Sequence, residues 1–122
     1  WSKKEHPQFF YSLKKDDKKL GYHRFWDGSI SAWRKGWTAD RYFEQMDKLS
    51  PSAIKKVQKG DGYTWTQETA DVARKCFKLT PAGTDISKLS REEREAIHSV
   101  VDHQAQRAAY RLAGVLNEIF KE

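Results

Sequence analysis

The sequence predicts a mainly α-helical fold with a short β-hairpin at its N-terminal end. Three observations support this prediction. Aromatic stretches flank a turn rich in lysine and aspartate near the start of the chain, which is typical of a hairpin. From Thr38 onward, helix-capping residues alternate with apolar positions at helical spacing. After Ser90 that spacing continues for roughly thirty residues, as expected of one long amphipathic helix.

The chain has 122 residues, the size of one domain, so we expect residues 1–122 to form a single domain. Residues 7–27 are expected to hold the hairpin and a turn, and residues 38–120 the helices. Apolar residues make up 38% and charged residues 33%, and no run approaches the roughly 18 apolar residues of a membrane span. The charged stretch after Trp1 is unlike the apolar part of a signal peptide, so we expect none here.

The hairpin is expected in the first part of the chain. QFFYSL has the aromatic content of a strand, KKDDKK is a polar turn, and LGYHRFW is a second extended or turning segment.

Start and stop signals predict the helices that follow. Thr38 can cap the segment ADRYFEQMDKL, and Ser50 can cap the next helix, with Pro51 at its first position and Gly60 as its end. The stretch YTWTQETADVARKCFKL has apolar residues near 3.6-residue spacing, and TPAGTD ends it. Ser90 and Glu93 form a capping box that starts the last helix.

The last helix carries a long apolar stripe. Its members are Ile97, Val101, Ala105, Ala108, Leu112, Val115, Leu116 and Ile119. A helix this long exceeds the average for globular proteins, and the short elements before it cannot cover all of it. We therefore expect a second chain, or a missing N-terminal half, to cover part of the stripe.

Charge and cysteine content leave alternatives open. The net charge of +6 favours contact with polyanions such as nucleic acid, although carboxylates interleave with the lysines and a merely solvated surface stays open. The single cysteine, Cys76, is either a reduced core residue or half of a bridge to another chain. The five tryptophans indicate an aromatic core or exposed rings that stack on bases, and we expect the core.

Three stretches in order, HRFWD, YTWTQETADVARKCF and HQAQRAAYRLAGVLNEIF, resemble the C-terminal part of the zinc-dependent single-strand nucleases of the S1/P1 type, relatives of zinc phospholipase C. The resemblance covers roughly residues 9–120, although Ala109 stands where the family often has glycine. It implies a helical array of the phospholipase C/nuclease type. Family members are about twice as long, so the chain resembles the C-terminal portion of a longer nuclease. Some members bridge a cysteine at the position of Cys76.

The resemblance implies that His23 and Asp27 ligate zinc. Imidazole nitrogen and carboxylate oxygen both suit this metal, and a four-residue gap in a helical turn places both side chains on one face. Phe25 and Trp26 would lie behind the ligands as walls that exclude water. The alternative from spacing alone is a hydrogen-bonded pair without metal.

Weaker candidates lie elsewhere in the chain. Trp1 and His6 have the spacing of two family zinc ligands, but Pro7 and an aromatic stretch follow where the family continues into a helix. Lys18, Lys19 and Arg24 flank the ligand pair and are candidates for phosphate contact, or are solvated turn residues. His98 and Asp102 repeat the four-residue gap, and we expect them to be a solvated pair on the last helix.

By resemblance, the chain is a zinc-dependent nuclease, or a fragment of one, that hydrolyses phosphodiesters in single-stranded DNA or RNA or in 3′-nucleotides. Most family ligands lie in the N-terminal half, so the isolated chain is expected to lack part of the site. The alternative is a non-enzymatic basic helical module, derived from that family, that binds nucleic acid or protein. The resemblance also implies a secreted or periplasmic location.

Overall fold

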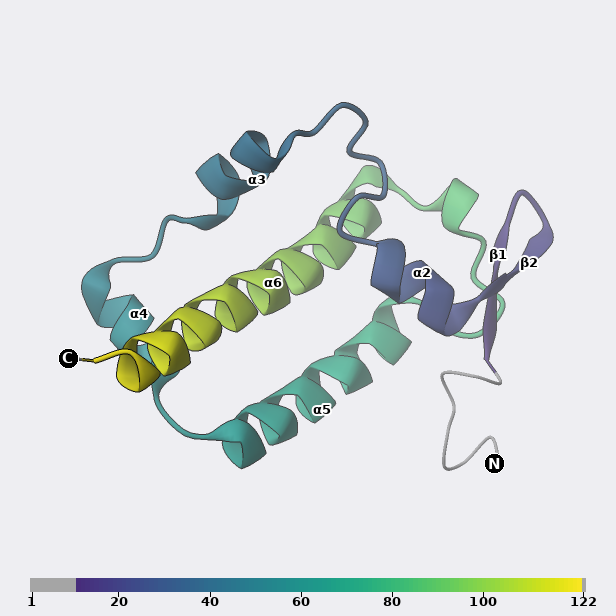
Figure 1. The fold of residues 1–122 in the computed structure, drawn as a ribbon. Helices are drawn as coiled ribbons and strands as arrows, with labels where there is room; N and C mark the ends of the chain where they lie inside the picture. Colours follow the sequence, from purple (N-terminus) through teal and green to yellow (C-terminus); the bar gives the residue numbers. More distant parts are fainter. Residues whose placement is uncertain (1–10, 122) are drawn as a thin grey trace.

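A computed structural model describes residues 11–121 and shows a helical array with a two-stranded hairpin at one end (Figure 1). The mainly α fold with a short N-terminal hairpin is therefore confirmed. The elements are β1 (Ser12–Lys15), β2 (Lys18–Gly21), α2 (Tyr22–Gly28), α3 (Ala39–Met46), α4 (Pro51–Gln58), α5 (Gly62–Leu79), the short 3₁₀ helix η1 (Ile86–Lys88) and α6 (Arg91–Ile119).

The hairpin is tighter than the sequence suggested. β1 and β2 pair antiparallel, with Leu13 opposite Leu20. Only Asp16 and Asp17 lie between the strands, and both have positive φ angles, 51° and 62°, as a type I′ turn requires. The second segment, expected to be extended or turning, does both: it is extended in β2 and turns into α2 directly afterwards.

The turn is fastened to the segment that precedes α6. The Asp16 backbone N–H donates to Ser87 Oγ at 3.1 Å, and the Asp17 N–H donates to Asp85 Oδ2 at 3.1 Å. On the strand itself, the Lys14 N–H donates to the Thr84 carbonyl at 2.8 Å. These bonds fix the hairpin relative to η1 and therefore relative to the start of α6.

The buried core lies at the hairpin end of the molecule. It consists of buried side chains from β1, α2, η1, the residue after η1, and α6: Leu13, Tyr22, Phe25, Ile86, Leu89 and Ile97. Figure 1 shows these elements gathered around the N-terminal part of α6. α2 is thus attached to the most tightly packed region of the described chain.

The helix starts follow the capping signals. Ser90 Oγ accepts from the Glu93 N–H at 3.1 Å, and the Glu93 carboxylate accepts from the Ser90 N–H at 2.7 Å, so the predicted capping box is present. Thr38 and Ser50 cap α3 and α4 as predicted. One helix start was not predicted: the Asp61 carboxylate accepts from the Thr64 N–H and caps α5.

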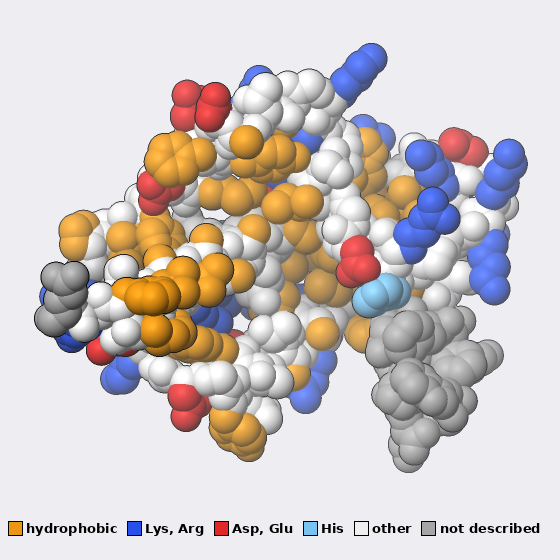
Figure 2. All heavy atoms as spheres, in the orientation of Figure 1, with side chains coloured by type: hydrophobic (Ala, Val, Ile, Leu, Met, Phe, Trp, Pro, Cys, Tyr) orange, Lys and Arg blue, Asp and Glu red, His pale blue; other side chains and the backbone are white. Residues whose placement is uncertain are grey.

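The helix α6 spans 29 residues, as its apolar spacing predicted, and α3, α4 and α5 lie along it (Figure 1). Its stripe is buried only at one end: Ile97 is fully buried, whereas Leu112 is 59% exposed and Ile119 is 65% exposed. Figure 2 shows hydrophobic side chains gathered over the C-terminal end of α6. That another chain or segment covers the C-terminal end of α6 remains a prediction. No described helix is long and apolar enough to cross a membrane.

Candidate metal centre

The helix α2 separates its side chains into an inward and an outward face. Tyr22 and Phe25 point inward and are 4% and 5% exposed. His23 and Asp27 lie on the outward face, with side chains 58% and 64% exposed. Gly21 offers no side-chain cap at the start of α2, and a seven-residue helix is too short to be stable alone. Packing of the inward face therefore holds the helix and presents the two polar side chains to solvent.

The two candidate ligands face each other. His23 Nε2 lies 3.0 Å from Asp27 Oδ2. Two donors on one tetrahedral zinc, each about 2.0–2.1 Å from the ion, are separated by roughly 3.3 Å, so only a small adjustment would let both atoms contact one ion. The same distance also suits a direct hydrogen bond, which is the alternative that the sequence left open.

The pair fits two positions of a zinc site and no more. Among residues 11–121, no group of three or more histidine, cysteine, aspartate or glutamate side chains could hold a metal ion. Catalytic zinc usually has three protein ligands. Any remaining ligands would have to come from outside the described residues. Trp1 and His6, the weaker candidates, also lie outside them.

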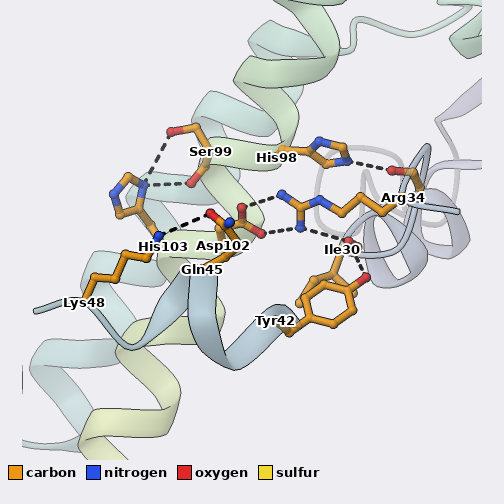
Figure 3. Close-up of polar contacts among 10 residues, drawn as sticks. Ile30, Arg34, Tyr42, Gln45, Lys48, His98, Ser99, Asp102 and His103 are labelled. Atoms are coloured by element: carbon orange, nitrogen blue, oxygen red, sulfur yellow. Dashed lines mark hydrogen bonds and ion pairs between the residues drawn. The ribbon is translucent and has the colours of Figure 1, made fainter. Parts of the chain in front are cut away.

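The second histidine–aspartate pair serves a different purpose. His98 Nε2 lies 2.6 Å from the Ala32 carbonyl, and Asp102 accepts two bonds from the Arg34 guanidinium at 2.6 and 2.5 Å (Figure 3). The Arg34 side chain is 7% exposed. The prediction of a solvated pair was therefore wrong, because both residues bind the loop that follows α2 and hold it against α6.

The remaining histidine and the thiol are engaged elsewhere. His103 Nδ1 lies 2.7 Å from the Ser99 carbonyl on the same helix. Burial raises the pKa of the Cys76 thiol to about 11, so this side chain is protonated at neutral pH. Cys76 is a free, half-buried thiol in this structure.

Phe25 belongs to the buried core, and Trp26 packs against that core from α2. Their rings meet edge to face, with centroids 5.6 Å apart. Trp26 Nε1 donates to the buried Thr80 Oγ1 at 3.0 Å, which joins α2 to the end of α5. The two aromatic residues thus anchor the helix that carries His23 and Asp27.

The predicted phosphate contacts line one cavity. Lys18, Lys19 and Arg24 lie around a space of about 550 Å³, together with Phe25 and Trp33. Figure 2 shows Lys and Arg side chains grouped on the hairpin side of the molecule. Lysine and arginine side chains around this open cavity can hold a phosphate group, although neither His23 nor Asp27 lines it.

The loop beside this cavity contains Trp33 and Arg34, two residues whose roles the sequence did not predict. Trp33 has a positive φ of 58°, unusual for a bulky residue, and the Arg94 guanidinium lies 5.4 Å from the centre of its ring. Arg34 and Asp102 are 68 positions apart, so no local sequence pattern predicts their contact.

Comparison with known protein families gives a match, which covers nearly the whole chain. The model of the S1/P1 nuclease family matches residues 10–121, which include α2 and the helices α5 and α6. No curated protein and no solved structure gives a significant match. The family match covers nearly the entire chain and includes His23 and Asp27. The chain therefore belongs to the S1/P1 nuclease family.

Proposed function

We propose that this chain contributes to a zinc-dependent nuclease site that acts on single-stranded DNA or RNA, with His23 and Asp27 as two of the zinc ligands. The observation that carries the proposal is the 3.0 Å approach of His23 Nε2 to Asp27 Oδ2 on the outward face of α2, inside a chain of this nuclease family. An imidazole nitrogen and a carboxylate oxygen are a donor set that zinc accepts.

Zinc in such a site lowers the pKa of a bound water and offsets charge on the phosphate. His23 would bind through Nε2 in its neutral form, and the negative charge of Asp27 would balance part of the charge of the ion. Phe25 and Trp26 close the inward side of α2, so solvent reaches the pair only from outside.

Lys18, Lys19 and Arg24 are proposed to hold the phosphates of the strand next to the ligand pair. Arg24 directly follows His23 in α2, and the lysines lie on β2, which leads into that helix. Positive charges placed beside the scissile phosphate favour binding of the substrate and of the more highly charged transition state.

Completion of the site is part of the proposal. Residues 1–122 act as one domain that corresponds to the C-terminal portion of a longer nuclease. The further ligands come from Trp1 and His6 or from a chain or segment that covers the exposed end of α6. The resemblance to the family also leads us to propose a secreted or periplasmic location for this chain.

A second candidate function is a basic module that binds nucleic acid without cleaving it. Two observations favour it: the described residues supply two metal donors and no third, and the chain carries a net charge of +6. Cleavage separates the two candidates, since the binding module would retain single-stranded DNA and leave it intact.

The test of the ligand role is the zinc content of the purified chain. We expect bound zinc in the wild type and its loss in His23→Ala and Asp27→Ala. His103→Ala is the matched control, because His103 is exposed and lies on a helix away from the pair. Zinc retained equally in His23→Ala and the wild type would refute the ligand role.

Digestion of single-stranded DNA tests the reaction. Chelation of the metal should abolish cleavage, and Arg24→Gln should raise the substrate concentration needed for half-maximal rate while zinc content stays unchanged. Cleavage that survives the chelator would contradict a metal-dependent mechanism.

A further inference from the structure

A side-chain hydrogen bond joins α2, the helix that carries His23 and Asp27, to the end of α5. Trp26 Nε1 donates to Thr80 Oγ1 at 3.0 Å, and Thr80 is fully buried. The Thr80 hydroxyl donates its own proton to the Cys76 carbonyl at 3.0 Å. A hydroxyl has one proton and two lone pairs, so this donated bond turns a lone pair of Thr80 toward the indole.

The other contacts of α2 are the packing of its inward face. Tyr22 and Phe25 are buried in the apolar core, and the Tyr22 ring stacks on Phe77 with centroids 4.7 Å apart. Packing keeps these side chains in place, and a hydrogen bond adds a direction to it, because the bond weakens steeply as its angle changes. The bond from Trp26 to Thr80 therefore adds a directional contact to this packing, and it resists small rotations of α2 about its axis.

Rotation of α2 would move the ligand atoms considerably. Side-chain ends lie roughly 5–6 Å from a helix axis, so a rotation of about 10° displaces them by about 1 Å. Binding constellations generally need their atoms within about 0.5 Å of the productive geometry. Trp26 lies between His23 and Asp27 in the sequence, so its orientation is transmitted directly to both.

We infer that Thr80 is a positioning residue for the His23–Asp27 pair, acting through the indole of Trp26. Thr80 contacts neither ligand and would not touch the metal. Its hydroxyl, oriented by Cys76 at the end of α5, sets the rotation of α2 and so the direction in which the two ligands point. The inference rests on the proposed zinc site and extends it to a residue far from it in the sequence.

The experiment measures zinc affinity of the chain by competition with a metal chelator, at a temperature at which circular dichroism shows each variant folded. Thr80→Val removes the hydroxyl with little change of shape and should weaken zinc binding about tenfold or more. Thr80→Ser keeps the hydroxyl and should retain the wild-type affinity. Thr66→Val is the matched control, because the Thr66 hydroxyl also bonds a carbonyl within α5 but lies near the opposite end of that helix.

A double-variant cycle separates positioning from general loss of stability. Trp26→Phe removes the indole N–H and should weaken zinc binding as Thr80→Val does. If the two residues act through one bond, the double variant should bind no more weakly than either single variant. If Thr80→Val does not fold, Thr80→Ser and Trp26→Phe still decide the matter: weaker binding in Trp26→Phe with normal binding in Thr80→Ser supports the inference.

The outcomes distinguish the inference from the function on which it rests. If the wild type and His23→Ala bind zinc alike, the ligand role fails and the inference fails with it. If His23→Ala loses zinc but Thr80→Val or Trp26→Phe binds it normally, only the positioning role is overturned. Additive losses in the double variant would also overturn it, because the two side chains would then act independently.

Discussion

Removal of the Asp102 carboxylate is expected to destabilise the chain substantially. Asp102 accepts two hydrogen bonds from Arg34, at 2.6 and 2.5 Å, and thereby ties the loop after α2 to α6 (Figure 3). The side chain of Arg34 is 7% exposed and that of Asp102 is 30% exposed. Asp102→Ala would leave the guanidinium charge nearly buried and without its carboxylate.

The expected loss in free energy of unfolding depends on the contacts that Arg34 retains in Asp102→Ala. Breaking a buried ion pair by removing one partner costs about 3–5 kcal/mol. Arg34 retains its bond to the Ile30 carbonyl at 3.1 Å and its position 4.4 Å from the centre of the Trp37 ring, and Asp102 is partly exposed. We therefore expect the free energy of unfolding to fall by about 2–3 kcal/mol, somewhat below the fully buried case.

Urea denaturation measures the effect. With an m-value of about 2 kcal/mol per molar urea, the midpoint should fall by about 1–1.5 M at unchanged m. Glu95→Ala is the control on the same helix, because its pair with Arg91 is exposed and should contribute little. Equal midpoints for Asp102→Ala and Glu95→Ala would refute the reasoning. The double variant Arg34→Met with Asp102→Leu should recover part of the loss, since it leaves no unpaired charge.

Three further predictions concern the core, a helix start and an acid-sensitive contact. Ile97→Ala, at a fully buried position, should lower the free energy of unfolding by about 2–5 kcal/mol in urea denaturation, whereas Leu112→Ala, 59% exposed, should change it little. Ser90→Ala removes a capping box and should lower the same free energy by about 1 kcal/mol, and an unchanged midpoint would contradict the cap's role. Asp85 has its pKa lowered to about 2, chiefly by the Ser87 hydroxyl. A carboxylate with a lowered folded pKa stabilises the fold above its unfolded pKa, and this stabilisation is lost as pH falls. The difference in melting temperature between wild type and Asp85→Asn should therefore shrink as pH falls from about 4 toward 2; a constant difference would refute the assignment.

Local patterns predicted the helix starts well. The bonds of the Ser90–Glu93 box, and of the Thr38 and Ser50 caps, join groups within three residues of each other. Such contacts depend on the chain's immediate neighbours and so can be identified in a sequence. Asp61 caps α5 in the same manner, but it directly follows Gly60, a residue typical of a helix end, so the local pattern there did not predict a helix start.

For the segment Tyr22–Gly28 the sequence left an extended and a turning conformation open, and the structure decided between them. Its aromatic residues favour an extended strand, and Gly21 supplies no cap, yet the segment forms a helix. Burial of Tyr22 and Phe25 in the core outweighs that local preference, since residues three positions apart share one face of a helix. A helical turn was nevertheless needed for His23 and Asp27 to face each other, and the structure has that turn.

The sequence by itself determined the family, the helical class, the capped helix starts and the spacing of His23 and Asp27, because these depend on residue order and on contacts within one or two turns. Only the tertiary structure decided what His98 and Asp102 bind, which residue anchors Trp26, and how much of α6 is exposed. Those contacts join residues 54 to 68 positions apart, and no local pattern fixes which distant side chains meet. The pair on α2 thus has its spacing from the sequence and its orientation from the packing beneath it.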